Sequence, residues 1–379
     1  MSNILSPQTV LFAVLDWGMG HATRTAPLIA AACEAGHRVH VASRGVGLAW
    51  LKERFAGQDV AFHEKPGRHI SYAPRWNFLH IARQMPGFLR SIAEEREWTA
   101  DFAQAHGVDR VFSDNCYGVS HPSVPSVLMT HQLHLPVPGI MRPAARVVVR
   151  RWCQSFEEIW VPDEQAPASL SGRLGHPPLL PERTFCVGVL SHLAGASGSA
   201  PTSTPTSTPT SATPIPDQHI HAVGMVSGPE PHRTLMEDGL RAWLQQIPGN
   251  HVVFAGRPGG GVRRDKNVVT HYSPRPEEIV AAWENARFLV CRAGYSTVMD
   301  LACQGKPAVL IPTPGQTEQL QIAEHLKGQP GFLLRSQADL LAMRMPSADE
   351  LERLPARRRF VANALAVARL QAWLAGSSA

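Results

Sequence analysis

The stretch FLVCRAGYSTVMDLACQGKPAVLIPTPGQTEQLQIA, residues 288–323, decides the fold of this chain. The apolar run at 288–291 predicts a buried parallel strand. Gly294 ends that strand, and a helix is expected to follow and run to about residue 303. A second apolar run at 308–311 predicts another buried strand, bounded by proline. Strand, glycine turn, helix and strand together form a βαβ unit, so we expect an α/β fold.

The glycine turn in this unit predicts a phosphate site. Gly294 lets a ligand approach the backbone closely. The helix start, where Ser296 or Thr297 is the expected N-cap, offers N–H groups and the positive end of the helix dipole. Asp300 lies one turn further and can accept hydrogen bonds from a ribose. The alternative is that Asp300 is an ordinary acidic residue near a helix start, because α/β proteins commonly contain such a turn.

The same stretch resembles the C-terminal donor-binding motif of the MurG-like glycosyltransferases, glycosyltransferase family 28. The matching residues are Cys291, Arg292, Ala293, Gly294, Thr297, Asp300, Gly305, Pro307, Ala308, Pro312 and Gln319. In that family the glycine turn holds the nucleotide diphosphate, an acidic residue (usually Glu) holds the ribose, and the glutamine contacts the donor sugar. The resemblance therefore implies a nucleotide-sugar site built around Gly294, Asp300 and Gln319.

Length and composition place the chain among globular proteins with two sizeable cores, since it has 379 residues and is 44% hydrophobic. A net charge of +5 does not require nucleic acid as a partner, and it suits an anionic sugar nucleotide or an anionic membrane surface. The six cysteines form no CxxC pair, which favours reduced thiols and no metal site. The start of the chain does not resemble a signal peptide, and no apolar run reaches the roughly 20 residues that span a bilayer. We expect a cytoplasmic protein, in possible peripheral contact with the inner face of the membrane.

The N-terminal part repeats the pattern of an apolar strand followed by a glycine turn. The run at 10–15 is followed by Asp-Trp-Gly-Met-Gly-His and then by a helical pattern. GxGxxG is absent and no acidic residue ends the strand at 39–42, which disfavours a dinucleotide-binding dehydrogenase. In the MurG-like family this loop ends in Gly-x-Gly-His and faces the cleft. The resemblance places Gly18 and Gly20 in the cleft and His21 near donor and acceptor; alternatively, His21 is a capping or packing residue.

Polar side chains follow the next strands of the predicted N-terminal sheet. The apolar run at 108–112 is followed by Ser113, Asp114 and Asn115, and His131 follows the strand after that. Residues just beyond the carboxyl ends of parallel strands face the ligand crevice. We therefore expect Asp114 to orient His21, and Asn115 and His131 to lie in the cleft on the acceptor side. The alternative for Asp114 is a turn residue.

The chain also resembles an uncharacterised bacterial group of MurG-like proteins. That group carries the strings LDWGxGHATR, SDNxYG, THQL and SGPEPxRT as a set. All four are present, at residues 15–24, 113–118, 130–133 and 227–234. This resemblance covers most of the chain but does not identify an acceptor.

Composition divides the chain into two domains. Residues 194–216 contain the repeat PTSTPTSTPT, which cannot form a core and predicts a flexible linker. We expect an N-terminal Rossmann-like acceptor domain at 1–190 and a C-terminal Rossmann-like donor domain at 217–379. The periodicity at 355–374 predicts a long terminal helix within the donor domain, with its three consecutive arginines on a solvated face.

Four further positions in the second half are candidate donor contacts. A strand at 220–226 leads into Ser227 and Gly228, which repeat the glycine turn and favour a phosphate contact. Tyr272 follows another strand, and its backbone is placed to contact the nucleobase. Arg292 is expected to stabilise the leaving diphosphate together with the helix dipole.

These observations predict a GT-B fold, in which two Rossmann-like domains face each other across a cleft. The expected function is transfer of a hexose or N-acetylhexosamine from a nucleotide sugar, expected to be a uridine diphosphate sugar, to an unknown lipid-linked or cell-envelope acceptor. His21 is the expected general base, oriented by Asp114, and no metal or cofactor is expected. A sugar-nucleotide epimerase remains an alternative, although no clear pair of acid/base carboxylates is present. A non-catalytic nucleotide-sugar-binding subunit is the other alternative, disfavoured because His21 and the donor motif occur together.

Overall fold

The protein divides into two compact units. The computed structural model describes residues 6–67, 78–194, 220–256 and 260–376. The N-terminal unit comprises Met1–Ser191 and Val361–Ala379, and the C-terminal unit comprises His192–Phe360. Nearly all of the tract expected to be a linker lies outside the described residues.

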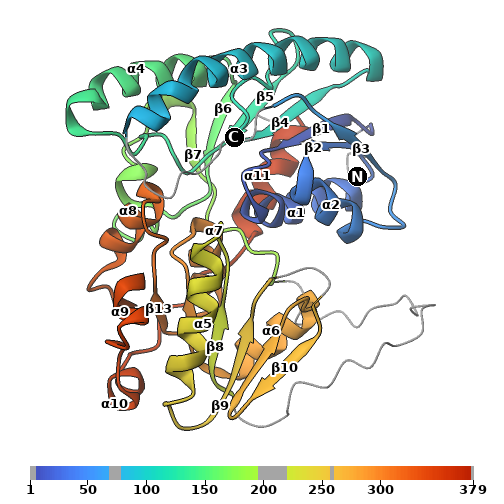
Figure 1. Cartoon of the computed structure of the whole chain (residues 1–379). Helices are drawn as coiled ribbons and strands as arrows, with labels where there is room; N and C mark the ends of the chain where they lie inside the picture. The colour runs from blue at the N-terminus through green and yellow to red at the C-terminus, as the bar shows by residue number, and fades with distance from the viewer. Residues whose placement is uncertain (1–5, 68–77, 195–219, 257–259, 377–379) are drawn as a thin grey trace. The chain divides into compact units, whose positions relative to one another are not determined.

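The N-terminal unit is built on a parallel sheet in the order β3-β2-β1-β4-β5-β6-β7 (Figure 1). Its strands are β1 (Thr9–Val14), β2 (Arg38–Ser43), β3 (Val60–Glu64), β4 (Arg110–Asp114), β5 (Ser126–Met129), β6 (Glu158–Val161) and β7 (Thr184–Cys186). The central strands are buried on both faces, which explains why they are continuous apolar runs and not alternating ones.

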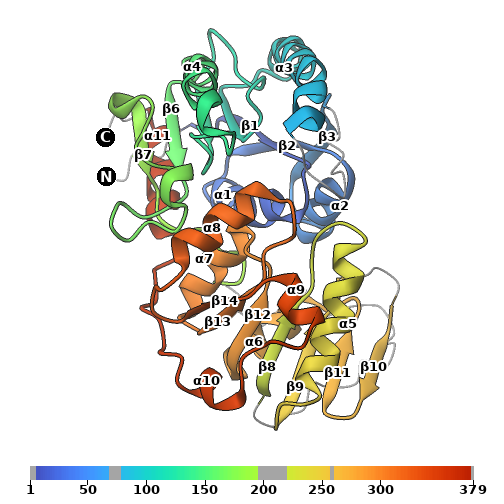
Figure 2. The ribbon, with the colours of Figure 1, turned by 60° about the vertical axis from the view of Figure 1, so that its left-hand side comes forward.

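Helices cover both faces of this sheet. They are α1 (Met19–Glu34), α2 (Gly45–Arg54), α3 (Phe78–His106), α4 (Arg142–Cys153) and α11 (Ala364–Leu374). Helix α1 packs against α2 and α11 on one face, while α3 and α4 lie on the other (Figure 2). The rings of Phe88 in α3 and Trp152 in α4 lie 5.6 Å apart and join these two helices.

The C-terminal unit contains a second sheet in the order β10-β11-β9-β8-β12-β13-β14, parallel except for the antiparallel edge pair β10–β11. Its strands are β8 (Ile220–Met225), β9 (Asn250–Phe254), β10 (Val262–Asp265), β11 (Val268–His271), β12 (Ala286–Cys291), β13 (Ala308–Leu310) and β14 (Phe332–Leu334). Its helices are α5 (His232–Leu244), α6 (Pro276–Asn285), α7 (Tyr295–Gln304), α8 (Thr317–Leu326), α9 (Gln337–Leu341) and α10 (Ala348–Glu352).

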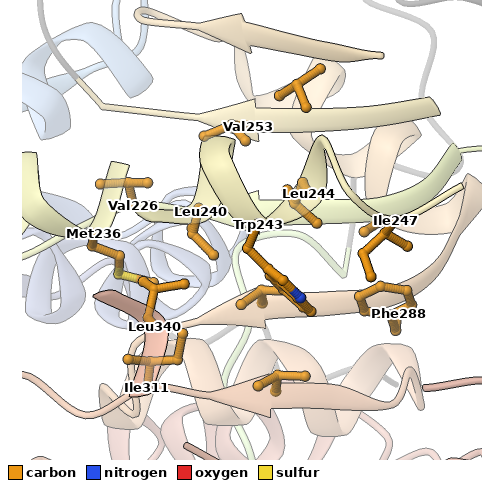
Figure 3. Close-up of a cluster of buried hydrophobic side chains, with 14 of the residues drawn as sticks. Val226, Met236, Leu240, Trp243, Leu244, Ile247, Val253, Phe288, Ile311 and Leu340 are labelled. Carbon is orange, nitrogen blue, oxygen red and sulfur yellow. The ribbon is translucent and has the colours of Figure 1, made fainter. Parts of the chain in front are cut away.

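The core of the C-terminal unit lies between its sheet and helix α5. Leu240 and Trp243 of α5 point toward Phe288 of the sheet, and Leu340 of α9 closes the cluster at one end (Figure 3). These side chains are almost fully buried. The i, i+3, i+4 spacing of apolar residues along α5 is the sequence signal for this packing.

Both sheets have the strand order of a dinucleotide-binding fold. In each sheet, the order in which the chain adds strands reverses at one point. In the N-terminal unit the order reverses between β1 and β4, and in the C-terminal unit between β8 and β12. Ligands of open α/β sheets bind beyond the carboxyl ends of the strands at such a reversal. The glycine turns noted in the sequence follow β1, β8 and β12, so the topology places them at these two points.

The expectation for the end of the chain is wrong in two respects. The terminal helix covers only Ala364–Leu374 and belongs to the N-terminal unit, where Arg369 donates to Glu158 at 2.8 Å and 3.0 Å. The preceding segment is not helical. Its backbone is held by tertiary bonds from Arg357 N–H to the carbonyl of Gly305 and from Phe360 N–H to Ala302, which outweigh the local helical preference.

The arginine run in this segment is also not simply a solvated face. The guanidinium of Arg357 lies 3.6 Å from the centre of the Phe332 ring. Arg357 is only partly exposed, and burial lowers its pKa to about 10. Cation–π stacking on a neighbouring strand thus holds one of the three arginines in place.

Candidate functional site

A cluster of charged side chains lies at the carboxyl edge of the N-terminal sheet, between β1 and β4. Asp114 ends β4, and His21 lies in the first turn of α1, which follows β1. The Nδ1 atom of His21 is 3.1 Å from Oδ1 of Asp114. The structure therefore brings these two predicted residues together across 93 positions of sequence.

Arg24 completes the cluster. Its Nε donates to Oδ2 of Asp114 at 3.0 Å, and its Nη2 donates to Oδ1. Thr25 donates its hydroxyl to Oδ2 at 2.7 Å. Asp114 is 0% exposed and Arg24 only 2%, so the pair is a buried ion pair with its hydrogen bonds satisfied.

The electrostatics of the cluster favour a neutral histidine beside an ionised aspartate. Burial lowers the pKa of His21, Arg24 lowers it further, and Asp114 acts in the opposite direction. Burial alone would raise the pKa of Asp114, but Arg24 and His21 together hold it well below its usual range. A neutral imidazole next to a carboxylate is the arrangement that a general base requires.

Two other residues predicted for the site also lie at this edge of the sheet. His131 is buried, and its Nδ1 lies 2.9 Å from Nη1 of Arg24. Asn115 accepts a hydrogen bond from the hydroxyl of Thr130 at 2.8 Å. Gly18 is the N-cap of α1 with φ of 102°, a conformation that favours glycine and that lets the chain turn from β1 directly into the helix.

Arg24 and Thr25 were not among the residues predicted for the site, although the sequence contained a signal. Arg24 follows His21 by three residues, which places both on the same face of α1. It also lies within the otherwise apolar face that packs on the sheet. The donors of a buried arginine require acceptors, and the carboxylate of Asp114 was an available candidate.

On the C-terminal unit, the turn between β12 and α7 has the predicted glycine but a different cap. The N-cap is Gly294 with no side-chain hydrogen bond, and Ser296 and Thr297 lie inside the first turn. The expectation that Ser296 or Thr297 caps α7 is therefore wrong. A Cβ added at Gly294 would meet only Thr297 Oγ1, at 3.9 Å. The fold itself thus leaves room at this position, and the missing side chain gives a ligand access to the backbone.

Asp300 is buried on α7 and faces a histidine. The Nδ1 atom of His192 lies 3.9 Å from Oδ1 of Asp300, and side-chain exposure is 18% and 10% respectively. His192 begins the C-terminal unit. This pairing was not predicted from the sequence.

Ser227 and Gly228 follow β8, the strand next to β12, and both are exposed. Gly228 has φ of 105°, and a Cβ there would lie 3.5 Å from Thr313 Oγ1. Thr313 follows β13, on the other side of β12. The loops after β8 and β13 therefore approach each other at the end where the glycine turn lies.

The structure does not support a contact between Arg292 and a diphosphate. Arg292 is 1% exposed. Its Nη1 donates to the carbonyls of Ile311 and Pro312, and its Nη2 donates to the carbonyl of His232 and to Gln337. Burial lowers the pKa of Arg292 to about 10. Its donors point into the protein, so Arg292 connects the loops around the site.

The side chains of Gln319 and Tyr272 also form hydrogen bonds within the C-terminal unit. The Oε1 atom of Gln319 accepts from the backbone N–H of Thr313 at 2.8 Å. The Tyr272 hydroxyl donates to Glu237 of α5 at 3.1 Å, and Tyr272 follows β11 at the same edge of the sheet. Both residues shape the loops at this edge, and their contacts with a donor stay predictions.

Comparison with known proteins supports the family resemblance. Residues 259–341 match the glycosyltransferase family 28 C-terminal domain. A UDP-N-acetylglucosamine–N-acetylmuramyl-(pentapeptide) pyrophosphoryl-undecaprenol N-acetylglucosamine transferase from Alkalilimnicola ehrlichii is 37% identical over 81 residues. That alignment covers 21% of this chain and 22% of the enzyme.

Solved structures share the fold over nearly the whole chain. The glycotransferase of kitacinnamycin has a TM-score of 0.62 at 16% identity, covering 98% of this chain and 95% of the other. MurG from Acinetobacter baumannii has a TM-score of 0.55 at 13% identity, covering 97% and 99%. The two Rossmann-like units thus form a GT-B fold. On these findings residues 259–341 match the family 28 C-terminal domain, and the chain as a whole is similar in fold to MurG.

Proposed function

We propose that this protein is a glycosyltransferase that moves a hexose or N-acetylhexosamine from a uridine diphosphate sugar to an acceptor hydroxyl. The family 28 domain carries the proposal, because its matched residues include the glycine turn at a reversal point of strand order. The acceptor would be lipid-linked or part of the cell envelope, as in the N-acetylglucosamine transferase that the chain resembles.

The donor would bind at the carboxyl edge of the C-terminal sheet. The N–H groups and positive dipole of the first turn of α7 would stabilise the charge that develops on the leaving diphosphate, without a requirement for a metal ion. Ser227 and Gly228 would contact the phosphates from the neighbouring loop. Asp300 would accept hydrogen bonds from the ribose.

The acceptor would be activated at the N-terminal unit. With its Nδ1 hydrogen donated to Asp114, neutral His21 would present the lone pair of Nε2 as general base. The acceptor oxygen would then attack the anomeric carbon as the bond between that carbon and the diphosphate oxygen breaks. His21 would take the hydroxyl proton, and UDP would leave.

A product search by mass spectrometry tests the function. Purified protein is incubated with several UDP-sugars and a cell lipid extract, and both UDP release and new masses are followed. We expect an acceptor-dependent product whose mass increases by one sugar residue. UDP-sugar converted to an isomer without acceptor would instead indicate an epimerase, and UDP binding without turnover would indicate a binding subunit.

Replacing Asp300 tests the donor site. Asp300→Ala is expected to weaken UDP affinity about tenfold or more, because losing a charge-assisted hydrogen bond costs about 1.5–3 kcal/mol. Isothermal titration calorimetry measures the change. Glu324→Ala, which removes an exposed carboxylate from the same unit, serves as control. Unchanged affinity in a folded Asp300→Ala protein would contradict the assignment.

Peripheral contact with an anionic membrane surface is supported by α4 and the short turn at 139–141 that precedes it. Ile140 is 92% exposed and Val147 is 68% exposed. The sequence of α4 contains four exposed arginines and no acidic residue. Exposed apolar side chains among arginines suit the headgroup region of an anionic bilayer. None of the described helices is long and apolar enough to cross a membrane.

Vesicle sedimentation tests this contact. The double variant Ile140→Asp, Val147→Asp is expected to reduce binding to phosphatidylglycerol vesicles about tenfold or more, because each buried apolar side chain contributes about 1.5–3 kcal/mol. Val46→Asp is the matched control, since Val46 is 63% exposed on α2 of the same unit. Equal loss of binding in both variants, or no binding by the wild type, would contradict this contact.

A further inference from the structure

We propose that Arg24 is a positioning residue that opposes protonation of His21 and fixes where the proton of His131 resides. The role of His21 in this inference rests on the proposed function. The contacts that Arg24 makes do not depend on that function. The side chain of Arg24 contacts Asp114 and both histidines.

The contact with His131 fixes the tautomer of that ring. An arginine guanidinium donates hydrogen bonds and cannot accept them. Nη1 of Arg24 lies 2.9 Å from Nδ1 of His131, so that nitrogen must be the acceptor. The proton of neutral His131 therefore resides on Nε2. The amide nitrogen of Gln132 lies 3.5 Å from Nε2 of His131, so a proton on that ring nitrogen requires the amide to turn its oxygen toward the ring.

The contact with His21 acts on its charge. Nη2 of Arg24 lies 2.9 Å from Nδ1 of His21, while Oδ1 of Asp114 lies 3.1 Å from the same atom. Protonated His21 would place a second cation against Arg24 in a buried site. Asp114 acts in the opposite direction, but burial and Arg24 together still lower the pKa of His21. Nδ1 of His21 can accept from Arg24 or donate to Asp114, and the general-base step of the proposed function requires the second.

The groups facing His21 are Arg24 on the same helix, Asp114 at the end of β4, and His131 after β5. Asp114 is wholly buried and requires a cationic partner. Without Arg24, the group that can supply the charge is His21 itself, because Thr25, which also donates to Asp114, is neutral. Removing the arginine should therefore convert His21 from a neutral base into the counterion of Asp114.

NMR titration of the histidine rings tests the inference without donor, acceptor or turnover. In Arg24→Gln the pKa of His21 is expected to rise relative to wild type, while Arg24→Lys, which keeps the charge, should keep it low. Thr25→Val is the matched control, because it removes one hydrogen bond to Asp114 without changing charge. An unchanged or lower His21 pKa in folded Arg24→Gln would overturn the proposal.

The wild-type protein supplies a second test should the variants fold poorly. Nitrogen-15 shifts report the protonated nitrogen of each ring. We expect His131 to carry its proton on Nε2. A proton on Nδ1 of His131 would overturn the proposal, because Arg24 could not then donate there. A proton on Nε2 of His21, with His131 as expected, would instead overturn the general-base step of the proposed function.

Discussion

His21→Ala is expected to lower kcat by roughly 10²–10⁴-fold, the usual contribution of a general base. The side chain lies at the carboxyl edge of the N-terminal sheet, where Asp114 contacts its Nδ1. Affinity for UDP should change little, because the residues proposed to hold the donor all lie in the C-terminal unit. Single-turnover kinetics with saturating UDP-sugar, together with calorimetric titration of UDP, separates these two quantities.

The control for this experiment is His37→Ala. His37 lies just before β2, at the opposite edge of the same sheet, where its ring accepts a hydrogen bond from the backbone of Gln8. The variant His37→Ala should leave kcat unchanged. If UDP affinity fell in His21→Ala and kcat did not, His21 would be a binding residue. Asp114 could not readily replace it as base, because that carboxylate is fully buried and its pKa is held well below the usual range.

Most of the strands and the edge of each sheet that carries the site could be predicted from the sequence. Parallel strands buried on both faces are continuous apolar runs, so β1, β4 and β12 were recognisable with errors of one or two residues at their ends. Glycine turns and polar residues follow these strands directly. The convergence of His21 and Asp114 then follows from adjacent parallel strands.

The parts that could not be predicted depend on partners distant in sequence. Nothing local indicates that Arg292 points inward, because its acceptors are backbone carbonyls that the fold alone brings near. The apparent helix at 355–374 is interrupted at Asn363, whose positive φ of 65° accompanies hydrogen bonds to Ser191. Helical periodicity extends through this point, and tertiary bonds override it.

Asp114→Ala is expected to destabilise the N-terminal unit by about 3–5 kcal/mol, the cost of leaving a buried charge without its partner. Arg24 is 2% exposed and donates two hydrogen bonds to this carboxylate, so the variant leaves a buried cation with unsatisfied donors. Urea unfolding followed by tryptophan fluorescence measures the loss. Trp160 is fully buried in β6 of the same sheet and reports on this unit.

The pH dependence of this effect has a definite sign. Because the folded-state pKa of Asp114 is depressed, its ionised form contributes stability above the ordinary pKa of aspartate, about 3.9, and that contribution is lost as the pH falls below it. Asp114→Ala should therefore differ most from wild type near neutral pH, and the two should converge in acid. A constant difference at every pH would mean that lost packing, and not lost charge, causes the destabilisation.

A double substitution distinguishes the contribution of the buried charges to stability from the contribution of side-chain packing. Replacing both partners by apolar residues of similar size, Arg24→Met with Asp114→Leu, leaves no buried charge to compensate, and such replacements are often neutral for stability or better. We expect the double variant to recover most of the stability lost in Asp114→Ala while remaining inactive. A double variant as unstable as Asp114→Ala would show that packing dominates here. Recovery of folding without activity would instead show that this buried pair is retained for the chemistry of His21 and contributes little net stability.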